Sequence, residues 1–435
     1  VELSNISDLT GVVFNGTAVF DTSGFSVSTA GDVNGDGIDD LIIGALYADS
    51  NGNNNAGSSY VVFGSSIGLP NPFDLDSLTG SSGFIINGVN FNDRSGVSVS
   101  SVGDVNGDGV DDIIIGASGA DPSGNSYAGS SYLIYGSSSG FPSPLNLSSL
   151  NGNNGFTING VAALDQSGFA VSSAGDVNGD GIDDLLIGAR DGDSVNGNDS
   201  GNSYVIFGSD ISMPTPFELD TIDGTNGFTL IGVAAGDRSG YAVSSASDIN
   251  GDGIDDLIIG ARFADPDGKS DAGSSHVVFG SDSNIPHPFD LGSLNGINGF
   301  SINGASAGDN FGRAVSSAGD INGDGIDDLI IGAYGVNNKA GRSYVIFGSS
   351  NAFTSPFTLA SLNGNNGFTL DGVDFFDLSG FSVSSAGDIN GDNIDDIIIG
   401  AHDADPGDNN AAGSSYVVYG NDLIFINGFD LAAND

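Results

Sequence analysis

The sequence predicts an all-β fold, a six-bladed β-propeller of four-stranded antiparallel blades, and three observations point to it. One Asp-rich motif recurs six times, at intervals of 72 residues except for a last interval of 68. Each repeat contains four short apolar runs bounded by Gly, Asn, Asp and Ser, a pattern typical of β-strands. No stretch shows a sustained 3.6-residue period, so we expect almost no helix.

The third repeat shows the four expected strands most plainly. They are strand A at 169–172, strand B at 184–188, strand C at 204–208 and strand D at 228–232. Four such strands recurring six times predict a propeller, because sheets arranged radially bury each other's faces. An open β-solenoid is the alternative, although its repeats are usually shorter.

We expect a single propeller over residues 1–435, whose ring is closed by the N-terminal strand. The blades are expected at about 24–88, 96–160, 168–232, 240–304, 312–372 and 380–435, the last completed by 11–16. The run 11–16 resembles strand D, as in 155–160, yet it precedes the first blade, so it is the expected missing strand of the sixth. The apolar run 423–426 is a rival for the same place.

The Asp-rich motif lies between strands A and B, and its nine residues are numbered positions 1 to 9. In the first blade this loop runs from Asp32 to Asp40. Side-chain oxygens at positions 1, 3, 5 and 9 and the carbonyl of position 7 form a set of hard ligands typical of Ca²⁺, while Gly at position 6 permits the tight turn. We therefore expect about six calcium ions. The predicted ligands are Asp32, Asn34, Asp36, Ile38, Asp40, Asp104, Asn106, Asp108, Val110, Asp112, Asp176, Asn178, Asp180, Ile182, Asp184, Asp248, Asn250, Asp252, Ile254, Asp256, Asp320, Asn322, Asp324, Ile326, Asp328, Asp388, Asn390, Asp392, Ile394 and Asp396.

The chemistry of the loop favours calcium over the alternatives. Metal-free Asn-Gly and Asp-Gly turns leave the crowding of carboxylates unexplained. Mg²⁺ prefers fewer protein ligands, and an EF-hand loop would lead into a helix instead of a strand. In the sixth blade Asn393 replaces Gly at position 6, which we expect to weaken that site somewhat. The Asp at position 8 is expected to face solvent or support the ligands from outside.

Composition limits the classes of function. The chain has eight Lys and Arg residues and 56 acidic residues, which gives a net charge of −48. This strong negative charge argues against nucleic-acid binding. No apolar run approaches the ~20 residues of a membrane helix. The chain has no Cys, and 38% of its residues are hydrophobic, more than a disordered acidic chain would hold.

At these residues the chain resembles the FG-GAP repeat family, known from the propeller of integrin alpha subunits. Phe311-Gly312 matches the first element of the family pattern, and Gly-Ala follows every strand B, as at Gly44-Ala45. The resemblance implies extracellular binding and adhesion with structural calcium. Two departures are that integrin propellers have seven blades, and that only some of those blades carry metal loops.

The basic residues are expected at the end of the blades opposite the Asp-rich loops, and a possible ligand face there includes Arg190, Arg238 and Arg262. Their alternative role is to offset nearby Asp residues. His276, His287 and His402 do not converge, and no nucleophile motif is apparent, so we expect no enzyme.

We expect an extracellular or cell-surface module that binds a protein or glycan through this face, a monomeric domain within a larger chain. The alternatives are a rigid calcium-stiffened spacer or surface-layer component, or a non-catalytic accessory domain of a larger secreted enzyme.

Overall fold

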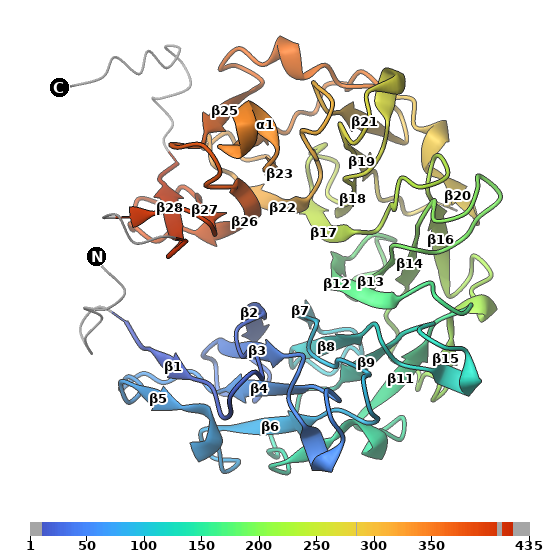
Figure 1. Ribbon diagram of the computed structural model, residues 1–435. Coiled ribbons are helices and arrows are strands. Elements are labelled where there is room, and N and C mark those ends of the chain that lie inside the picture. The colour runs from blue at the N-terminus through green and yellow to red at the C-terminus, as the bar shows by residue number, and fades with distance from the viewer. Residues whose placement is uncertain (1–10, 284, 407–410, 421–435) are drawn as a thin grey trace. The chain divides into compact units, whose positions relative to one another are not determined.

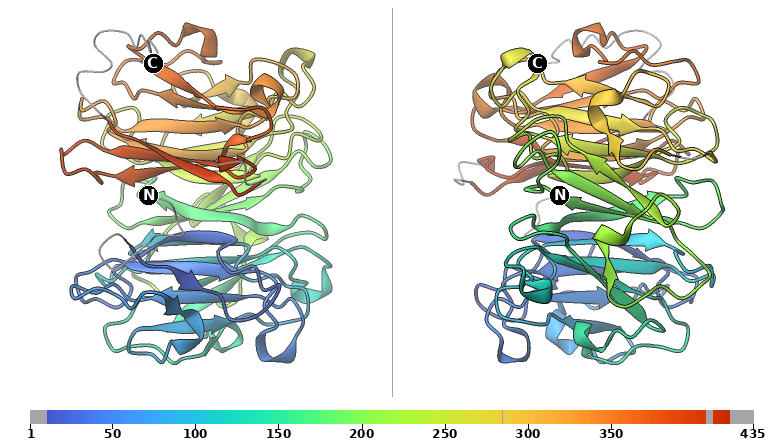
Figure 2. Two further views of the ribbon diagram at one scale, coloured as in Figure 1. Left: turned by 60° about the vertical axis from the view of Figure 1, so that its left-hand side comes forward. Right: turned by 90° about the vertical axis from the view of Figure 1, so that its right-hand side faces the viewer.

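The computed structural model describes residues 11–283, 285–406 and 411–420. Its fold is the predicted all-β, six-bladed propeller, with helix confined to short turns (Figure 1). The described residues form two compact units. The first comprises those up to Ser173 with Ile182–Gly192 and Tyr204–Gly227; the second comprises Ala174–Gly181, Asp193–Ser203 and those from Phe228 on. In each unit the connections lie at the two ends of the strands (Figure 2).

The blades contain strands A to D in chain order. The A strands are β2 (Ser26–Gly31), β7 (Ser98–Gly103), β12 (Ser167–Gly175), β17 (Ala242–Ser247), β22 (Ala314–Gly319) and β26 (Ser379–Gly387). The B strands are β3 (Asp40–Ala45), β8 (Asp112–Ala117), β13 (Asp184–Ala189), β18 (Asp256–Ala261), β23 (Asp328–Ala333) and β27 (Asp396–Ala401). The C strands are β4 (Ser58–Val62), β9 (Ser130–Ile134), β14 (Asn202–Ile206), β19 (Ser274–Val278), β24 (Arg342–Ile346) and β28 (Ser414–Val418). The D strands are β6 (Gly83–Asn87), β11 (Gly155–Asn159), β16 (Gly227–Ile231), β21 (Gly299–Asn303) and β25 (Gly367–Asp371).

Two-residue strands and single helical turns lie between these strands. The short strands are β1 (Phe14–Asn15), β5 (Phe73–Asp74), β10 (Leu145–Asn146), β15 (Phe217–Glu218) and β20 (Phe289–Asp290). The 3₁₀ turns are η2 (Ser50–Gly52), η3 (Leu75–Ser77), η4 (Pro122–Gly124), η5 (Leu147–Ser149), η6 (Leu219–Thr221), η7 (Pro266–Gly268), η8 (Leu291–Ser293) and η9 (Leu359–Ser361). The α-helix α1 (Val336–Lys339) lies in the B–C connection of the fifth repeat, which is four residues shorter than the others.

The sheets of the first unit have the orders β10-β6-β4-β3-β2 and β15-β11-β9-β8-β7. Strands A to D pair antiparallel, whereas each D strand also pairs parallel with the short strand of the next repeat, as β6 does with β10. The second unit holds the sheets β17-β18-β19-β21, β22-β23-β24-β25 and β26-β27-β28. The residues of the third blade are divided between the two units.

The N-terminal strand lies beside the first blade's short strand. β1 pairs parallel with β5, Phe14 opposite Phe73, in the manner of a D strand beside the short strand of the next repeat. It therefore stands where the D strand before the first blade belongs. That it completes the sixth blade and closes the ring stays a prediction, and the rival run 423–426 lies outside the described residues.

The core follows from strands that are apolar on both faces. All six residues of β8 are buried, because the sheet packs against neighbours on each side. In the first unit one cluster joins Ile42 and Phe84 of the first blade to Ile113 and Ile115 of the second. Burial of both faces fixes the blades of each unit against one another and positions the loops at their ends.

Candidate metal loops and the opposite end of the blades

The Asp-rich loops begin and end side by side. In the first blade the loop leaves β2 at Asp32 and enters β3 at Asp40. The antiparallel register shifts between Thr29 and Gly31, so that Gly31 pairs with Asp40. The same shift precedes the loops of blades two, four, five and six. This bulge brings position 1 close to position 9 across the end of the hairpin.

The carboxylate at position 1 holds the turn together. Oδ1 of Asp32 accepts the backbone N–H of Asp36 at 2.8 Å, and Oδ2 accepts that of Gly37 at 2.7 Å. The same two hydrogen bonds occur in the loops that begin at Asp104, Asp176, Asp248, Asp320 and Asp388. At position 6 the backbone is left-handed, with φ of 86° at Gly37 and 68° at Asn393, so Asn takes the conformation expected of it.

The carboxylate at position 9 is the most buried part of the loop. Asp40 is 1% exposed, and its five equivalents are fully buried. Its Oδ1 accepts the N–H of Gly64, just beyond strand C, at 2.8 Å, and the other five blades repeat this bond. Nδ2 of Asn34, at position 3, donates to both oxygens of Asp40 at 3.3 and 3.2 Å. Positions 3 and 9 therefore face each other.

Burial makes four of the position-9 carboxylates poor anions. It raises the pKa of Asp40 to about 6 and the pKa values of Asp112, Asp256 and Asp328 to about 8. The carboxylates at positions 5 and 1 raise these pKa values further, while the N–H bonds to the carboxylates lower them. The loop thus holds an acidic group where its negative charge is unfavourable without a nearby cation.

The Asp at position 8 has a partner that sequence reasoning missed. Oδ2 of Asp111 accepts the N–H of Asp32, the first residue of the preceding blade's loop, at 2.8 Å. The same link joins Asp183 to Asp104, Asp255 to Asp176 and Asp395 to Asp320. Each lies within one unit and connects successive blades. The sequence signal that could have revealed this contact is the Gly before position 1. At Gly31 an added Cβ would lie 2.3 Å from Oδ2 of Asp111, so a larger side chain does not fit there.

The predicted ligands at positions 1, 3, 5 and 9 therefore lie in one turn, and position 8 points to the neighbouring blade. Among the described residues, no three acidic or His side chains are arranged closely enough to hold an ion. Oδ1 of Asp36, at position 5, accepts the N–H of Ile38 at 3.0 Å. The donor set is nonetheless all oxygen, and it surrounds a buried acid, which fits a hard cation.

At the opposite end of the second unit, three arginines alternate with aromatic rings. We call Arg238, Arg262, Arg313, Tyr241, Phe263 and Phe381 the arginine–aromatic row. The Arg262 guanidinium carbon lies 4.2 Å from the Tyr241 ring centre and 4.3 Å from that of Phe263. Arg313 lies 3.9 Å from the Phe381 ring centre. All six side chains are half-buried, at the starts of A strands or just after β18.

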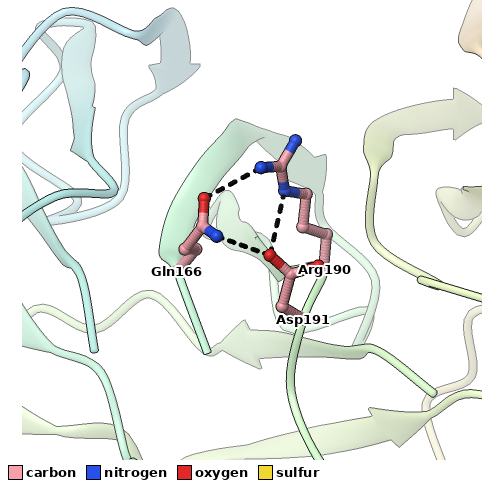
Figure 3. Close-up of polar contacts among 3 residues, drawn as sticks. All are labelled: Gln166, Arg190 and Asp191. Atoms are coloured by element: carbon pink, nitrogen blue, oxygen red, sulfur yellow. Dashed lines mark hydrogen bonds and ion pairs between the residues drawn. The ribbon is translucent and has the colours of Figure 1, made fainter. Parts of the chain in front are cut away.

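Arg190 belongs to the first unit and has a different setting. Its guanidinium carbon lies 3.7 Å above the ring centre of Phe169. Nη2 donates to Oε1 of Gln166 at 2.9 Å, Nε lies 3.4 Å from Oδ2 of Asp191, and Gln166 Nε2 donates to that same Oδ2 at 2.5 Å (Figure 3). Arg190 is thus engaged with an acid, in line with the charge-offsetting role. The structure does not place it in one site with Arg238 and Arg262.

The three histidines lie apart, as the sequence predicted. His276 is buried in β19. Nδ1 of His287 accepts the N–H of Thr229 at 3.2 Å. His402 stacks on Phe381 with 4.4 Å between ring centres and lies 3.2 Å from Asp403. In the described part of the chain, no helix is long and apolar enough to cross a membrane.

Comparison with known proteins finds relatives of two kinds. A sequence model of the FG-GAP repeat matches residues 23–62, 95–134, 167–206, 239–278, 311–346 and 379–418. Integrin alpha pat-2 of Caenorhabditis elegans is 32% identical over 249 residues, which are 54% of this chain and 18% of that protein. Integrin alpha-PS2 of Drosophila melanogaster is 30% identical over 185 residues, 41% of this chain and 12% of that protein. Phosphatidylinositol-glycan-specific phospholipase D of Homo sapiens is 34% identical over 161 residues, 37% of this chain and 18% of that protein. The chain thus spans less than a fifth of each relative's length.

Proposed function

Because the chain belongs to the FG-GAP repeat family, we propose that it is a non-catalytic extracellular binding module whose blades each hold one structural calcium ion. The observation that carries the proposal is the buried carboxylate at position 9. All six copies are 1% exposed or less, and the carboxylates of positions 1 and 5 lie in the same turn. A bound divalent cation is the simplest way to make that arrangement favourable.

The residues at positions 1, 3, 5 and 9, with the carbonyl of position 7, would hold the ion. Calcium would supply positive charge that offsets the buried carboxylate and its neighbours. The amide of Asn34 now presents Nδ2 to Asp40; a half-turn of that amide would present its oxygen instead, and the two orientations are chemically close. The position-1 carboxylate already shapes the turn through its two N–H bonds.

Bound calcium would also reduce the net negative charge of the whole chain. Six ions would bring the net charge from −48 to −36, since six times two is twelve. At tenfold excess over its dissociation constant each ion would stabilise the fold by about 1.4 kcal/mol. Six ions would then contribute on the order of 8 kcal/mol, comparable to the net stability of a domain. A fold of this kind suits a compartment rich in calcium, which supports an extracellular location.

The arginine–aromatic row is the proposed ligand surface. The chain holds eight basic residues in all, and three of them lie in this row, so it is a local exception on a strongly acidic protein. The stacked aromatic rings fix the orientation of the planar guanidinium groups. A guanidinium held in this way presents paired N–H donors, which is the geometry that binds carboxylates. We propose that the row binds acidic side chains of a protein ligand, with an acidic glycan as the other outcome of the test.

Equilibrium dialysis with calcium tests the metal part of the proposal, with an expected stoichiometry of about six. The ligand part is tested with immobilised acidic peptides and acidic glycans in saturating calcium. Replacing Arg238 and Arg262 by Ala should abolish peptide binding and leave calcium stoichiometry unchanged, whereas Arg190→Ala, in the first unit, serves as the matched control. Peptide binding that survives in the double variant would rule out the row as the ligand surface.

A second candidate function is that of a non-catalytic accessory domain in a larger secreted enzyme. The similarity to phosphatidylinositol-glycan-specific phospholipase D favours it, because that relative is named as an enzyme and matches 161 residues of this chain. A purely structural spacer is the remaining alternative. Both predict calcium-dependent stability with no acidic partner at the row, which separates them from the binding module.

A further inference from the structure

The fourth blade contains a cavity of about 780 Å³ at the end opposite its Asp-rich loop. Its walls come from the loop before β17, from the B–C connection after β18, and from β19 and β21, with further lining from Asp199, Leu291 and Pro356. The volume lies in the range of small-molecule sites. Every lining residue belongs to the second unit, and none is a predicted calcium ligand.

One residue of strand C differs between the fourth blade and the others, and this difference accounts for the space in the cavity. The position held by His276 is Tyr in the other five repeats, as at Tyr132 in the second. Tyr132 is 5% exposed; burial, followed by the charge of Asp93, raises the pKa of its hydroxyl. The equivalent of Asp93 in the fourth blade is Asp237, which also lines the cavity. The shorter imidazole of His276 therefore leaves room in front of Asp237 that a phenol ring would fill.

The buried imidazole lacks a hydrogen-bond partner at one nitrogen. His276 is 4% exposed, its ring lines the cavity, and its Nδ1 has no partner among the described residues. Burial lowers the pKa of His276 to about 4, so the ring is neutral near pH 7. A buried polar atom without a partner costs free energy. A ligand group in the cavity could supply the missing hydrogen bond.

The charge of the walls selects the kind of ligand. The carboxylates of Asp199, Asp237, Asp265 and Asp271 line the cavity, against the single guanidinium of Arg238. Asp237 accepts the N–H of Ala234 through Oδ2, and Asp265 accepts the N–H of Asp271 through Oδ1. Each of these two carboxylates has a second oxygen that can accept a bond from a ligand. Their mutual repulsion raises the pKa of Asp237 beyond the effect of burial, to about 6.

Apolar residues complete the lining. Val233, Phe263, Leu291, Leu294 and Pro356 surround the polar groups. A ligand with a short hydrocarbon stem and a cationic head would cover these residues and place its N–H donors among the carboxylates. A carboxylate or phosphate ligand would meet an excess of like charge.

We propose that this cavity, lined by His276, Asp237 and Asp265, binds a small organic cation of the alkylammonium class. The ammonium group donates to Asp237 and Asp265, and Nδ1 or Nε2 of the neutral imidazole accepts a further N–H bond. The site is specific to the fourth blade, because it depends on His in place of Tyr. None of its lining residues is a predicted calcium ligand, and it shares Arg238 and Phe263 with the arginine–aromatic row.

Isothermal titration of the calcium-saturated chain with cadaverine tests the proposal, with methyl glucoside as a neutral polyol and glutarate as an anion. We expect saturable binding of cadaverine alone. His276→Tyr, which restores the residue of the other blades, should abolish it. Asp265→Asn should weaken it at least about tenfold, because a charge-assisted bond is lost. The matched control is Asp121→Asn, whose carboxylate accepts the N–H of Tyr127 and faces Asp93 as Asp265 faces Asp237.

Three results would overturn the proposal: no saturable heat with cadaverine, equal affinity for methyl glucoside, or unchanged cadaverine binding by His276→Tyr. Calcium stoichiometry is measured on the same samples. Normal stoichiometry with no cadaverine binding refutes this site alone, whereas loss of calcium binding in the wild-type chain refutes the proposed function and leaves the cavity result standing.

Discussion

The backbone N–H of Asp32 donates a 2.8 Å hydrogen bond to Oδ2 of Asp111, which lies 79 residues further along the chain in the next blade. Position 1 of one loop is thereby tied to position 8 of the following loop, and the tie recurs along both units. The residue that would hold an ion and the residue that joins two blades are neighbours in the same turn. Order in a loop should therefore be transmitted to the contact between blades.

The hydrogen bond between Asp32 and Asp111 predicts that even a small side chain at Gly31 lowers the free energy of unfolding strongly. This glycine has φ of 64°, and an added Cβ would lie 2.3 Å from Oδ2 of Asp111. Gly31→Ala should therefore destabilise the fold by about 1–3 kcal/mol more than backbone strain alone. Gly124 is the matched control, with φ of 82° and no atom within 4 Å of its added Cβ. Denaturant unfolding of both variants makes the comparison, and equal costs would show that the tie is absent in solution.

Removing one position-9 charge should have opposite effects with and without calcium. Asp112 is fully buried beside Asp108 and Asp104 and its pKa is raised to about 8, so at pH 9 Asp112→Asn relieves an unfavourable charge when no cation is present. In chelator the variant should be at least as stable as the wild type. In saturating calcium it should be less stable by about 1–3 kcal/mol, because a charged ligand is lost. Thermal melting in the two conditions measures the reversal.

The control for that reversal is Asp220→Asn, an exposed acid in the turn η6. It should melt like the wild type in both conditions. A destabilised Asp112→Asn in chelator as well as in calcium would mean that the carboxylate stabilises the loop without any ion.

Buried Asp93 predicts a pH dependence away from the metal loops. Burial raises its pKa to about 6, from 3.8 in the unfolded chain. Because the folded pKa is the higher one, stability falls as pH rises from about 4 to 6, by up to about 2 kcal/mol. Asp93→Asn should remove this loss, since its side-chain oxygen can still accept the N–H of Asn90. Melting in saturating calcium between pH 4 and 7 should show a flatter profile for the variant; parallel profiles would refute the prediction.

Filling the fourth-blade cavity should stabilise the protein. His276→Tyr removes a buried nitrogen without a partner and adds ring volume next to Asp237, so unfolding should cost about 0.5–2 kcal/mol more. Urea unfolding measures the difference. Tyr132→Ala, at the equivalent place in the second blade, should lose about 3 kcal/mol or more, because its ring is 5% exposed. A large loss of stability in His276→Tyr would mean that the cavity cannot hold the ring.

Much of the fold could be read from the repeat itself. The apolar run predicted for strand B at 184–188 is β13, Asp184–Ala189, and the Asp-rich motif marks the entry to each B strand. The predicted strand D at 228–232 is β16, Gly227–Ile231. These strands are visible in the sequence because buried strands are continuous apolar runs, and the period of 72 residues places each copy.

The features of the fold and the site that the sequence did not predict depend on contacts between residues far apart in the chain. β5 and β10 are two residues long, and their partners lie in a neighbouring repeat, so no local pattern reveals them. The role of Asp111 was missed for the same reason, as its donor is 79 residues away. The Arg262 ring stacking was also beyond sequence reasoning, because it combines residues of B–C and D–A connections that meet only in the folded blade.

We propose that the Asp-rich loops hold calcium and that calcium makes the blades rigid. Thermal melting of the wild-type chain in excess calcium and in chelator tests it most directly. We predict a markedly higher melting temperature in calcium, with a rise that continues as calcium increases. Identical melting temperatures in the two conditions would contradict the claim.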